Sequence, residues 1–264
     1  MGTKPIVSVI TVVKDHEQGL LDTYQSLHSQ LCIDWQNVIV VGKSQDETLR
    51  NARALAAKDI RVLVIEEEAR GIYPAMNLGI EHSVGKYLWF MNAGDKFFDS
   101  SVIGTGLELI EKSNADIVLG GHRVHGDQRK FHFLDSALTV QNFIYNRRSG
   151  CHQSMIFRKS AVLRDSCYDV IFKLASDYDL VIRLLKEKPG VKSRKVFSLV
   201  EPGGLTDQGL KLMHQEKHRI RMANTGSKPA ARFKSLTWMF LALGKIEIKK
   251  FMANGINGDK HPTA

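Results

Sequence analysis

Cysteine is scarce in this sequence of 264 residues and forms no pattern. The three cysteines, Cys32, Cys151 and Cys167, are odd in number and lack the paired spacing of a zinc site. Such cysteine usage is typical of a protein that works in a reducing compartment and is not held together by disulfides. We therefore expect a cytoplasmic protein.

Long apolar runs are also missing. Residues 6–13 are too few for a secretory signal, and Lys14 follows them directly. The most apolar late run, residues 236–243, is far below the roughly 20 residues that span a bilayer. We therefore expect neither a secreted protein nor a transmembrane helix.

Two common phosphate-binding loops are absent from the sequence. No G-x-G-x-x-G follows the first apolar run, and there is no G-x-x-x-x-G-K-[ST]. These absences argue against a dinucleotide-binding fold and against a P-loop enzyme. If this protein handles phosphate, metal ions and side chains must do so.

Acidic residues are outnumbered in one part of the chain. Of the net charge of +9, residues 207–264 carry +7, from eight lysines and three arginines against four acids. A basic segment suits an anionic membrane, a phosphorylated substrate or nucleic acid, and it equally suits a solvated face. No nucleic-acid recognition motif accompanies it, so we expect no nucleic-acid partner.

Apolar runs and helical periodicity alternate in the sequence, which predicts parallel strands in a doubly wound layer. Strands are expected at residues 6–13, 38–41, 61–65, 87–91, 116–119, 130–133 and 195–200. Helices are expected at residues 17–30, 49–57, 74–84, 102–112 and 138–145.

The most informative stretch is residues 71–98, GIYPAMNLGIEHSVGKYLWFMNAGDKFF. Pro74 suits the first position of a short helix, and Gly85 suits its C-terminal cap. A nearly all-apolar strand then runs into an acidic turn, residues 92–95. Ligand sites in open α/β sheets form at such carboxyl ends of strands.

The pattern GIY-x-AMN-x-GI, an apolar strand and N-A-G-D resembles the family 2 nucleotide-sugar glycosyltransferases, which have the GT-A fold. The resemblance covers roughly residues 6–206. It implies an α/β fold of the GT-A type, a nucleotide-diphospho-sugar transferase sandwich around a mixed, mostly parallel sheet. It also implies that Asp95 binds a divalent metal, Mn²⁺ or Mg²⁺, and that Asn92 lies near the donor ribose.

A second segment, residues 41–48, resembles the family loop that holds the donor base. Ser44, Asp46 and Thr48 match this loop, whereas Val41 and Pro74 replace family carboxylates. Asp46 alternatively caps the following helix. The resemblance implies that the nucleotide-sugar is bound by Val13, Ser44, Asp46, Gly71, Met76, Asn77, Asn92, Ala93 and Gly94.

The segment A-S-D-Y-D-L resembles the family element that supplies the catalytic base, and the resemblance assigns this role to Asp177. Ser176 is expected to cap the following helix, with Asp179 completing a variant capping box. The H-Q pair and the later G-G-L-T loop match family elements on the acceptor or diphosphate side. The resemblance of these two elements implies acceptor or diphosphate contacts for five residues: His152, Gln153, Gly203, Gly204 and Thr206.

Two alternatives stay open in these segments. His152 is either a ligand of the acceptor or phosphate, or a structural residue whose hydrogen bonds are satisfied internally. The helix after the glycine pair either contacts the diphosphate or forms a solvated basic face. Its candidate contacts are Lys211, His214, Lys217, His218 and Arg221.

The C-terminal segment combines aromatic and aliphatic residues with lysines at positions 233–252. This composition fits a reversible anchor on anionic membrane, a helix packed on the core, or a homodimer contact. We expect a glycosyltransferase domain at residues 1–226, with a nucleotide-sugar half at 1–95 and an acceptor half at 96–226. A basic helix and tail would follow at 227–264.

The resemblance implies an inverting, metal-dependent glycosyltransferase that acts in surface polysaccharide biosynthesis: capsule, exopolysaccharide or lipopolysaccharide. The donor would be a nucleoside-diphosphate sugar, the acceptor a sugar or lipid-linked sugar, and the location the inner face of the cytoplasmic membrane. The alternative is a catalytically impaired nucleotide-sugar-binding protein. Val41 and Pro74 favour this alternative, and the retained Asp95 and Asp177 argue against it.

Overall fold

The computed structural model describes residues 4–68, 71–127, 130–145, 150–203, 209–225 and 237. Contacts divide the chain into two units, residues 1–202 and 203–264, which are treated separately below. The boundary predicted after residue 226 stays a prediction.

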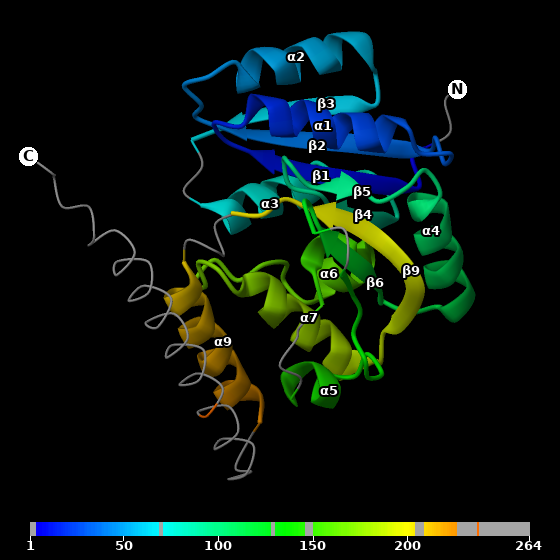
Figure 1. The fold of residues 1–264 in the computed structure, drawn as a ribbon, viewed down its shortest axis with the longest axis vertical. Coiled ribbons are helices and arrows are strands. Elements are labelled where there is room, and N and C mark those ends of the chain that lie inside the picture. The colour runs from blue at the N-terminus through cyan, green and yellow to red at the C-terminus, as the bar shows by residue number, and fades with distance from the viewer. Residues whose placement is uncertain are drawn as a thin grey trace, which may run out of the picture. The chain divides into compact units, whose positions relative to one another are not determined.

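The first part of unit 1 alternates strands and helices as the sequence predicts (Figure 1). Pairing is parallel throughout: β1 lies between β2 and β4, and β3 lies outside β2. The elements are β1 (Val7–Val13), α1 (Glu17–His28), β2 (Trp35–Gly42), α2 (Thr48–Lys58), β3 (Val62–Glu67), α3 (Ile72–Glu81) and β4 (Tyr87–Phe90).

The second part of unit 1 is less regular. The sequence did not predict β5 or α6, because each is short and lacks a clear periodicity. The elements are β5 (Lys96–Phe97), α4 (Val102–Ser113), β6 (Ile117–Val124), β7 (Phe131–His132), α5 (Val140–Tyr145), the 3₁₀ turn η1 (His152–Ser154), β8 (Met155–Arg158), α6 (Lys159–Arg164), α7 (Ser176–Glu187) and β9 (Val191–Val200).

One mixed sheet runs through unit 1 in the order β3-β2-β1-β4-β8-β6-β9-β5, with β7 paired to β6. Because β8 is antiparallel to both β4 and β6, these two strands point the same way, and β9 is parallel to β6. The sheet is therefore mostly parallel, as predicted. The carboxyl ends of β1, β2, β4, β6 and β9 face one edge, where the acidic turn follows β4.

Helices cover both faces of this sheet. On one face, α1 and α4 pack with the strands around Trp89, whose ring centroid lies 5.2 Å from that of Phe97 and 5.3 Å from that of Phe197. On the other face, α3 lies close to β1. A Cβ added to Gly79 would come within 2.5 Å of the Ile10 side chain, so this glycine permits the close approach.

The ends of α3 differ from the prediction. The helix begins at Ile72 after Gly71, so Pro74 is its third residue and not its first. Pro74 is still tolerated, because the first four N–H groups of a helix have no partner within it. The predicted C-terminal cap, Gly85, is wrong, since the helix ends at Glu81 and its C-cap is His82. Gly85 instead packs against Ser8, where an added Cβ would lie 2.5 Å from the backbone nitrogen.

In unit 2 the structure describes one long helix, α9 (Leu210–Asn224), which carries the basic residues expected after the glycine pair. Apart from Thr237, the helix predicted at residues 233–252 lies outside the described residues. Within the described ranges, no helix combines the length and apolar composition that a membrane crossing requires.

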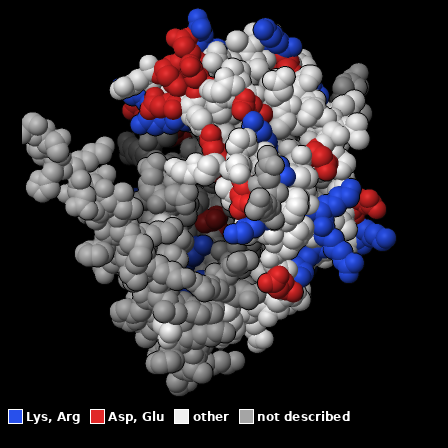
Figure 2. All heavy atoms as spheres, viewed as in Figure 1, with Lys and Arg blue, Asp and Glu red and all other residues white. Residues whose placement is uncertain are grey.

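Charge of both signs is present on the described surface. Figure 2 shows acidic side chains over the carboxyl end of β3 and basic side chains over β9 and α4. Lys195 of β9, for example, reaches Thr105 of α4 at 3.2 Å. The net positive charge of the chain therefore does not come from a uniformly basic unit 1.

A buried carboxylate ties the second part of unit 1 together. Asp116, 3% exposed, lies just before β6 and pairs with Lys188 at 3.0 Å, Arg158 at 3.3 Å and Arg164 at 3.4 Å. These partners come from the ends of α7, β8 and α6. Removing the carboxylate would leave three cations without their shared counter-charge.

We therefore expect Asp116→Ala to lower the free energy of unfolding by about 3 kcal/mol, because breaking a buried ion pair leaves uncompensated charge. Urea unfolding followed by circular dichroism measures the change. The control is Glu66→Ala, which removes an exposed pair with Arg53 and should cost about 1 kcal/mol or less. Equal losses in the two variants would contradict this role for Asp116.

Candidate active site

The acidic turn after β4 is fixed by α1. Thr23 on this helix donates its hydroxyl to the backbone carbonyl of Asp95 at 2.7 Å. The backbone N–H of Gly94 lies 3.0 Å from both the Thr23 hydroxyl and the Gly19 carbonyl. These contacts with Thr23 and Gly19 of α1 therefore fix the backbone conformation of the turn.

Asp95 is a buried carboxylate, only 5% exposed. Its Oδ1 accepts a hydrogen bond from the backbone N–H of Glu201 at 2.9 Å. The pKa of Asp95 is raised to about 7, chiefly by burial and also by the nearby Glu201 carboxylate, while the Glu201 N–H and the Gln153 side chain oppose the rise. Such a group favours either a proton or a cation beside it.

Two further residues, Glu201 and His16, which the sequence did not predict, lie beside this turn. β5 pairs with β9 antiparallel, and this pairing brings Glu201, the residue after β9, next to Asp95. The Glu201 carboxylate lies 2.7 Å from His16 Nε2. A Cβ at Gly94 (φ +96°) would collide with this carboxylate. Glu201 therefore fills the space that a side chain at position 94 would take.

These residues fit a hard divalent cation. Asp95 and Glu201 offer carboxylate oxygens, and Asn92 Oδ1 is buried with no hydrogen-bond partner among the described residues. Oxygen donors of this kind suit Mg²⁺ and Mn²⁺. Across the described ranges, however, no three His, Cys, Asp or Glu side chains converge closely enough to hold a metal by themselves. The protein would then supply only part of a coordination shell.

The predicted donor-base loop after β2 is bonded to the loop after β1. The Ser44 hydroxyl accepts from the Asp15 N–H at 3.0 Å. Asp46 accepts from the Thr48 N–H at 3.0 Å and from the Glu17 N–H at 3.2 Å. Thr48 and Glu17 are the first residues of α2 and α1, so Asp46 serves both helix starts. The contacts support the capping alternative for Asp46.

Several predicted donor contacts have side chains that face the core. Val13 pairs with Val41 in the β1–β2 register, and both belong to one core cluster against which Ala93 packs. Met76 is 2% exposed within α3. A carboxylate in place of Val41 would thus be buried among apolar groups. Val13 and Met76 are thus buried, and their predicted contacts with the donor stay predictions.

Asn77 of the AMN sequence is occupied within the protein. Its Nδ2 donates to the Tyr168 carbonyl at 2.9 Å, and its Oδ1 accepts from the Tyr168 N–H at 3.0 Å. The side chain thus clamps the segment that precedes α7 onto α3. Its predicted contact with the donor stays a prediction, and these two bonds do not support it. Gly71, with φ +135°, is the N-cap of the same helix.

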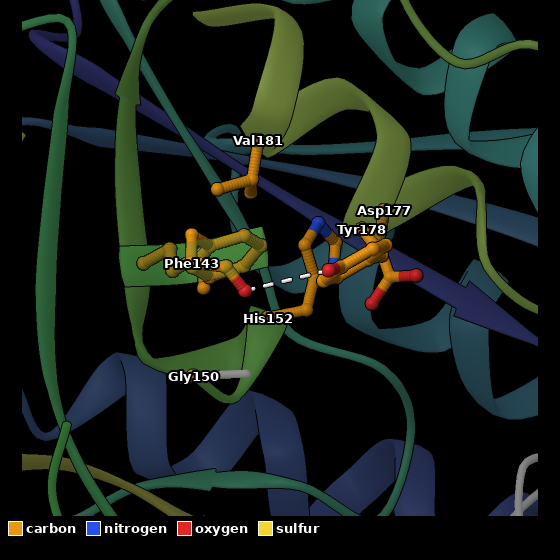
Figure 3. A pocket seen from close by; sticks show the side chains of 7 residues that line it. Phe143, Gly150, His152, Asp177, Tyr178 and Val181 are labelled. Carbon is orange, nitrogen blue, oxygen red and sulfur yellow. Dashed lines mark hydrogen bonds between the residues drawn. The ribbon is translucent and has the colours of Figure 1, made fainter. Parts of the chain in front are cut away.

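Asp177 lies in the first turn of α7, half-buried, and its Oδ1 accepts a hydrogen bond from the Tyr73 hydroxyl at 3.0 Å. Figure 3 shows its carboxylate at one side of a pocket, with the hydrogen bond from Tyr178 to the Phe143 carbonyl across it. The pocket is lined by Phe143, Gly150, His152, Met155, Asp177, Tyr178 and Val181.

The predicted capping box at the start of α7 is wrong. The N-cap is Ala175, and Ser176 is the first helical residue, with its Oγ buried and unpartnered within the part of the chain that the structure describes. Asp179 turns away from the cap and bonds Arg183, one helical turn later, at 2.8 Å. Asp179 therefore has a structural partner, although not the one the sequence indicated.

His152 is a buried residue with satisfied contacts. Its Nε2 lies 2.6 Å from the Tyr168 hydroxyl, and its ring stacks on Phe90 at 4.9 Å. Burial lowers the pKa of His152, so the ring is neutral at pH 7, although the Asp177 charge partly opposes this shift. The contacts support the structural alternative. A contact between His152 and an acceptor stays a prediction.

The remaining acceptor-side residues are only partly described. The Gln153 side chain accepts a hydrogen bond from the Cys151 thiol at 3.0 Å. Gly203 has φ +87° and begins unit 2. Gly204 and Thr206 lie outside the described residues, so their predicted roles stay predictions, as do those of the basic residues on α9.

Curated proteins similar to this chain are glycosyltransferases. A "PGL/p-HBAD biosynthesis glycosyltransferase" of Mycobacterium bovis is 25% identical over 209 residues, which is 77% of this chain and 80% of that protein. The "Uncharacterized glycosyltransferase EpsJ" of Bacillus subtilis is 28% identical over 128 residues, 48% of this chain and 37% of that protein.

Solved structures share the fold at low sequence identity. TarS 1–349 of S. aureus has a TM-score of 0.68 and 15% identity, covering 91% of this chain and 71% of that one. The mannosyltransferase PcManGT from Pyrobaculum calidifontis, in complex with GDP-Man and Mn²⁺, has a TM-score of 0.66 and 12% identity, covering 97% and 80%. These neighbours confirm the GT-A type of fold.

A family model, "Glycosyl transferase family 2", matches residues 8–172, more than half of the sequence. The match includes the first eight strands, the acidic turn and the segment that carries His152. It ends before Asp177, which the family model therefore does not reach. On this match the chain belongs to glycosyl transferase family 2.

Proposed function

We propose that this glycosyltransferase moves a sugar from a nucleoside-diphosphate sugar to an acceptor hydroxyl with inversion at the anomeric carbon. The observation that carries the proposal is a pair of carboxylates in different surroundings. Asp95 is buried in the turn after β4, whereas Asp177 is half-buried at a pocket. Because their environments differ, the two carboxylates suit different roles: Asp95 beside a cation and Asp177 as a base.

In this scheme Asp177 takes the proton of the acceptor hydroxyl. As the proton leaves, the acceptor oxygen forms a bond to the anomeric carbon. The bond from that carbon to the diphosphate oxygen breaks, and its electron pair leaves with the nucleoside diphosphate. A single displacement of this kind inverts the configuration. General-base help is typically worth 10²–10⁴-fold.

A divalent cation fits beside the acidic turn, where Asp95, Glu201 and Asn92 would hold it. When bound, such a cation neutralises charge on the departing diphosphate. The protein offers two carboxylates at this place, so donor oxygens would complete the coordination shell. We therefore expect the metal to bind weakly alone and much more tightly together with the nucleotide.

The named neighbours support a nucleotide-sugar donor and a metal. TarS has been solved with UDP and with UDP-GlcNAc, and PcManGT with GDP-Man and Mn²⁺. The relative named "PGL/p-HBAD biosynthesis glycosyltransferase" supports a role in glycan biosynthesis, and we propose that the acceptor belongs to surface glycan assembly, such as capsule, exopolysaccharide or lipopolysaccharide. Val41 and Pro74 stand where family carboxylates are usual, so the donor base is left open.

A binding protein that lost catalysis is the second candidate, and only Val41 and Pro74 favour it. Donor hydrolysis with added Mn²⁺ separates the two candidates, because a pure binding protein releases no nucleoside diphosphate. A thermal-shift panel of nucleoside diphosphates with Mn²⁺ would first identify the donor base, since a tight ligand stabilises the folded state.

The two carboxylates of the SDYD segment should behave differently. Asp177→Asn keeps the shape and removes the base, so transfer should fall about 100-fold or more while nucleotide and Mn²⁺ still bind. Asp179→Asn weakens the bond to Arg183 and should cost roughly 1 kcal/mol of stability, with near-normal turnover of the folded protein.

Steady-state transfer and calorimetric nucleotide affinity, measured for both variants, test this assignment. Near-normal transfer by a folded Asp177→Asn protein would remove Asp177 as the base. A loss confined to Asp179→Asn would move the role to that residue.

Asp95 should make stability pH-dependent in the metal-free protein. Its pKa is raised to about 7 in the folded state, against about 3.9 in an unfolded chain, so the folded state holds its proton more tightly. Stability is therefore lost as pH rises between these values. Asp95→Asn stays neutral and should avoid up to about 3 kcal/mol of the loss between pH 5 and pH 8.

Urea unfolding of both proteins at several pH values, with chelator present, measures this difference. Adding Mn²⁺ and a nucleoside diphosphate at pH 8 should stabilise the wild type more than Asp95→Asn. If the free energy of unfolding changed with pH in the same way in both proteins, a raised pKa of the buried Asp95 would be contradicted.

We further propose that the chain works at the inner face of the cytoplasmic membrane, held by its basic C-terminal segment. Each basic residue near an anionic surface contributes roughly 1 kcal/mol. Removing residues 227–264 should therefore weaken sedimentation with vesicles of anionic lipid and spare donor hydrolysis. Unfolding of the truncated protein would instead assign this segment to the core.

A further inference from the structure

We infer that Tyr73 is a positioning residue for Asp177, so that the GIY-x-AMN stretch serves the acceptor base and not the donor. The inference rests on the proposed function, in which Asp177 is the base. Tyr73 lies on α3 and is 6% exposed. Its hydroxyl donates to Asp177 Oδ1 at 3.0 Å, across 104 positions of sequence.

This hydrogen bond has a fixed direction. Burial, followed by the Asp177 charge, raises the pKa of Tyr73 far above its usual range, so the hydroxyl keeps its proton and always donates. The bond engages Oδ1, and the second oxygen of the carboxylate can take the acceptor proton. A hydrogen bond to a carboxylate favours its charged form, which is the form that a base needs.

A rigid frame holds Tyr73 in place. Its ring stacks on that of Tyr168, with centroids 5.4 Å apart and planes at 29°. Tyr168 is held twice: its backbone is clamped by both ends of the Asn77 amide, and its hydroxyl lies 2.6 Å from His152 Nε2. Each of these groups is buried or half-buried. The frame thus fixes the hydroxyl that orients the base.

Other charged and titratable groups near Asp177 are few in the described ranges. Tyr73 faces it from α3, His152 from η1, and Tyr168 from the segment before α7. His152 is kept neutral by burial, and Tyr168 stays protonated because burial raises its pKa. On α7 itself, Asp179 is paired with Arg183. The Tyr73 hydroxyl is therefore the group among these that donates directly to the base.

The same contacts argue against a donor role for this stretch. The Tyr73 hydroxyl is bonded to Asp177, and both polar ends of the Asn77 side chain are bonded to Tyr168. The Tyr73 hydroxyl proton is committed to Asp177, and each polar end of the Asn77 amide already has one partner, so neither side chain can turn toward a donor while these bonds stand. Loss of the Tyr73 hydroxyl should thus change proton transfer and leave nucleotide affinity unchanged.

The test is Tyr73→Phe, which keeps the ring and its stacking and removes only the hydroxyl. We expect kcat to fall about tenfold, since hydrogen bonds to charged groups are the stronger class. The acidic limb of the kcat–pH profile should move to higher pH, because the charged form of the base loses a donor. The affinity for nucleoside diphosphate with Mn²⁺ should match that of the wild type.

Tyr24→Phe is the matched control. Tyr24 donates its hydroxyl to the Asp59 carboxylate at 2.9 Å, the same kind of bond at a distant place on α1. This variant should leave kcat and the position of the acidic limb unchanged. It thereby separates a general cost of losing a tyrosine–aspartate bond from an effect on the base.

An unmoved acidic limb in folded Tyr73→Phe protein would overturn the inference, and so would a loss of nucleotide affinity. Asp177→Asn, measured alongside, separates this failure from failure of the proposed function. If Asp177→Asn loses transfer and Tyr73→Phe behaves as wild type, only the positioning role is wrong. If Asp177→Asn retains transfer, the proposed base is wrong as well.

Discussion

The burial of Asp95 is the constraint on which this site depends. Its carboxylate lies in a turn that α1 holds through Thr23, and the end of β9 closes over it through the Glu201 N–H. A buried charge of this kind is costly without a counter-charge, and burial raises the pKa of Asp95 to about 7. The sheet thus builds a place where a cation is favoured, at the edge where the parallel strands end.

The second carboxylate, Asp177, is supported in a different way. It lies in the first turn of α7, lines a pocket and accepts a hydrogen bond from the Tyr73 hydroxyl. Asp95 is enclosed and burial disfavours its anion, whereas Asp177 is only half-buried. In the function that we propose, this contrast in environment is the reason for placing the cation beside Asp95 and the base at Asp177.

Much of the fold could be predicted from the sequence, because the first four strands are apolar runs joined by helices of regular periodicity. The neighbours of the site could not. Glu201 reaches Asp95 only because β5, a strand of two residues, pairs with β9. Asn77 was assigned to the donor, yet its partner Tyr168 lies 91 positions away. Local sequence patterns carry no signal for such long-range contacts. The predicted capping box is wrong because the N-cap of α7 is Ala175 and Asp179 pairs with Arg183.

The most direct test of the account is the stereochemistry of donor cleavage. Proton NMR can follow the anomeric signal of the released or transferred sugar in the first minutes, with Mn²⁺ and a nucleotide sugar of defined anomer. We expect the product sugar to have the opposite anomeric configuration from the donor, because a base-assisted single displacement inverts the anomeric carbon. Release of the same anomer, before mutarotation can produce it, would contradict the account.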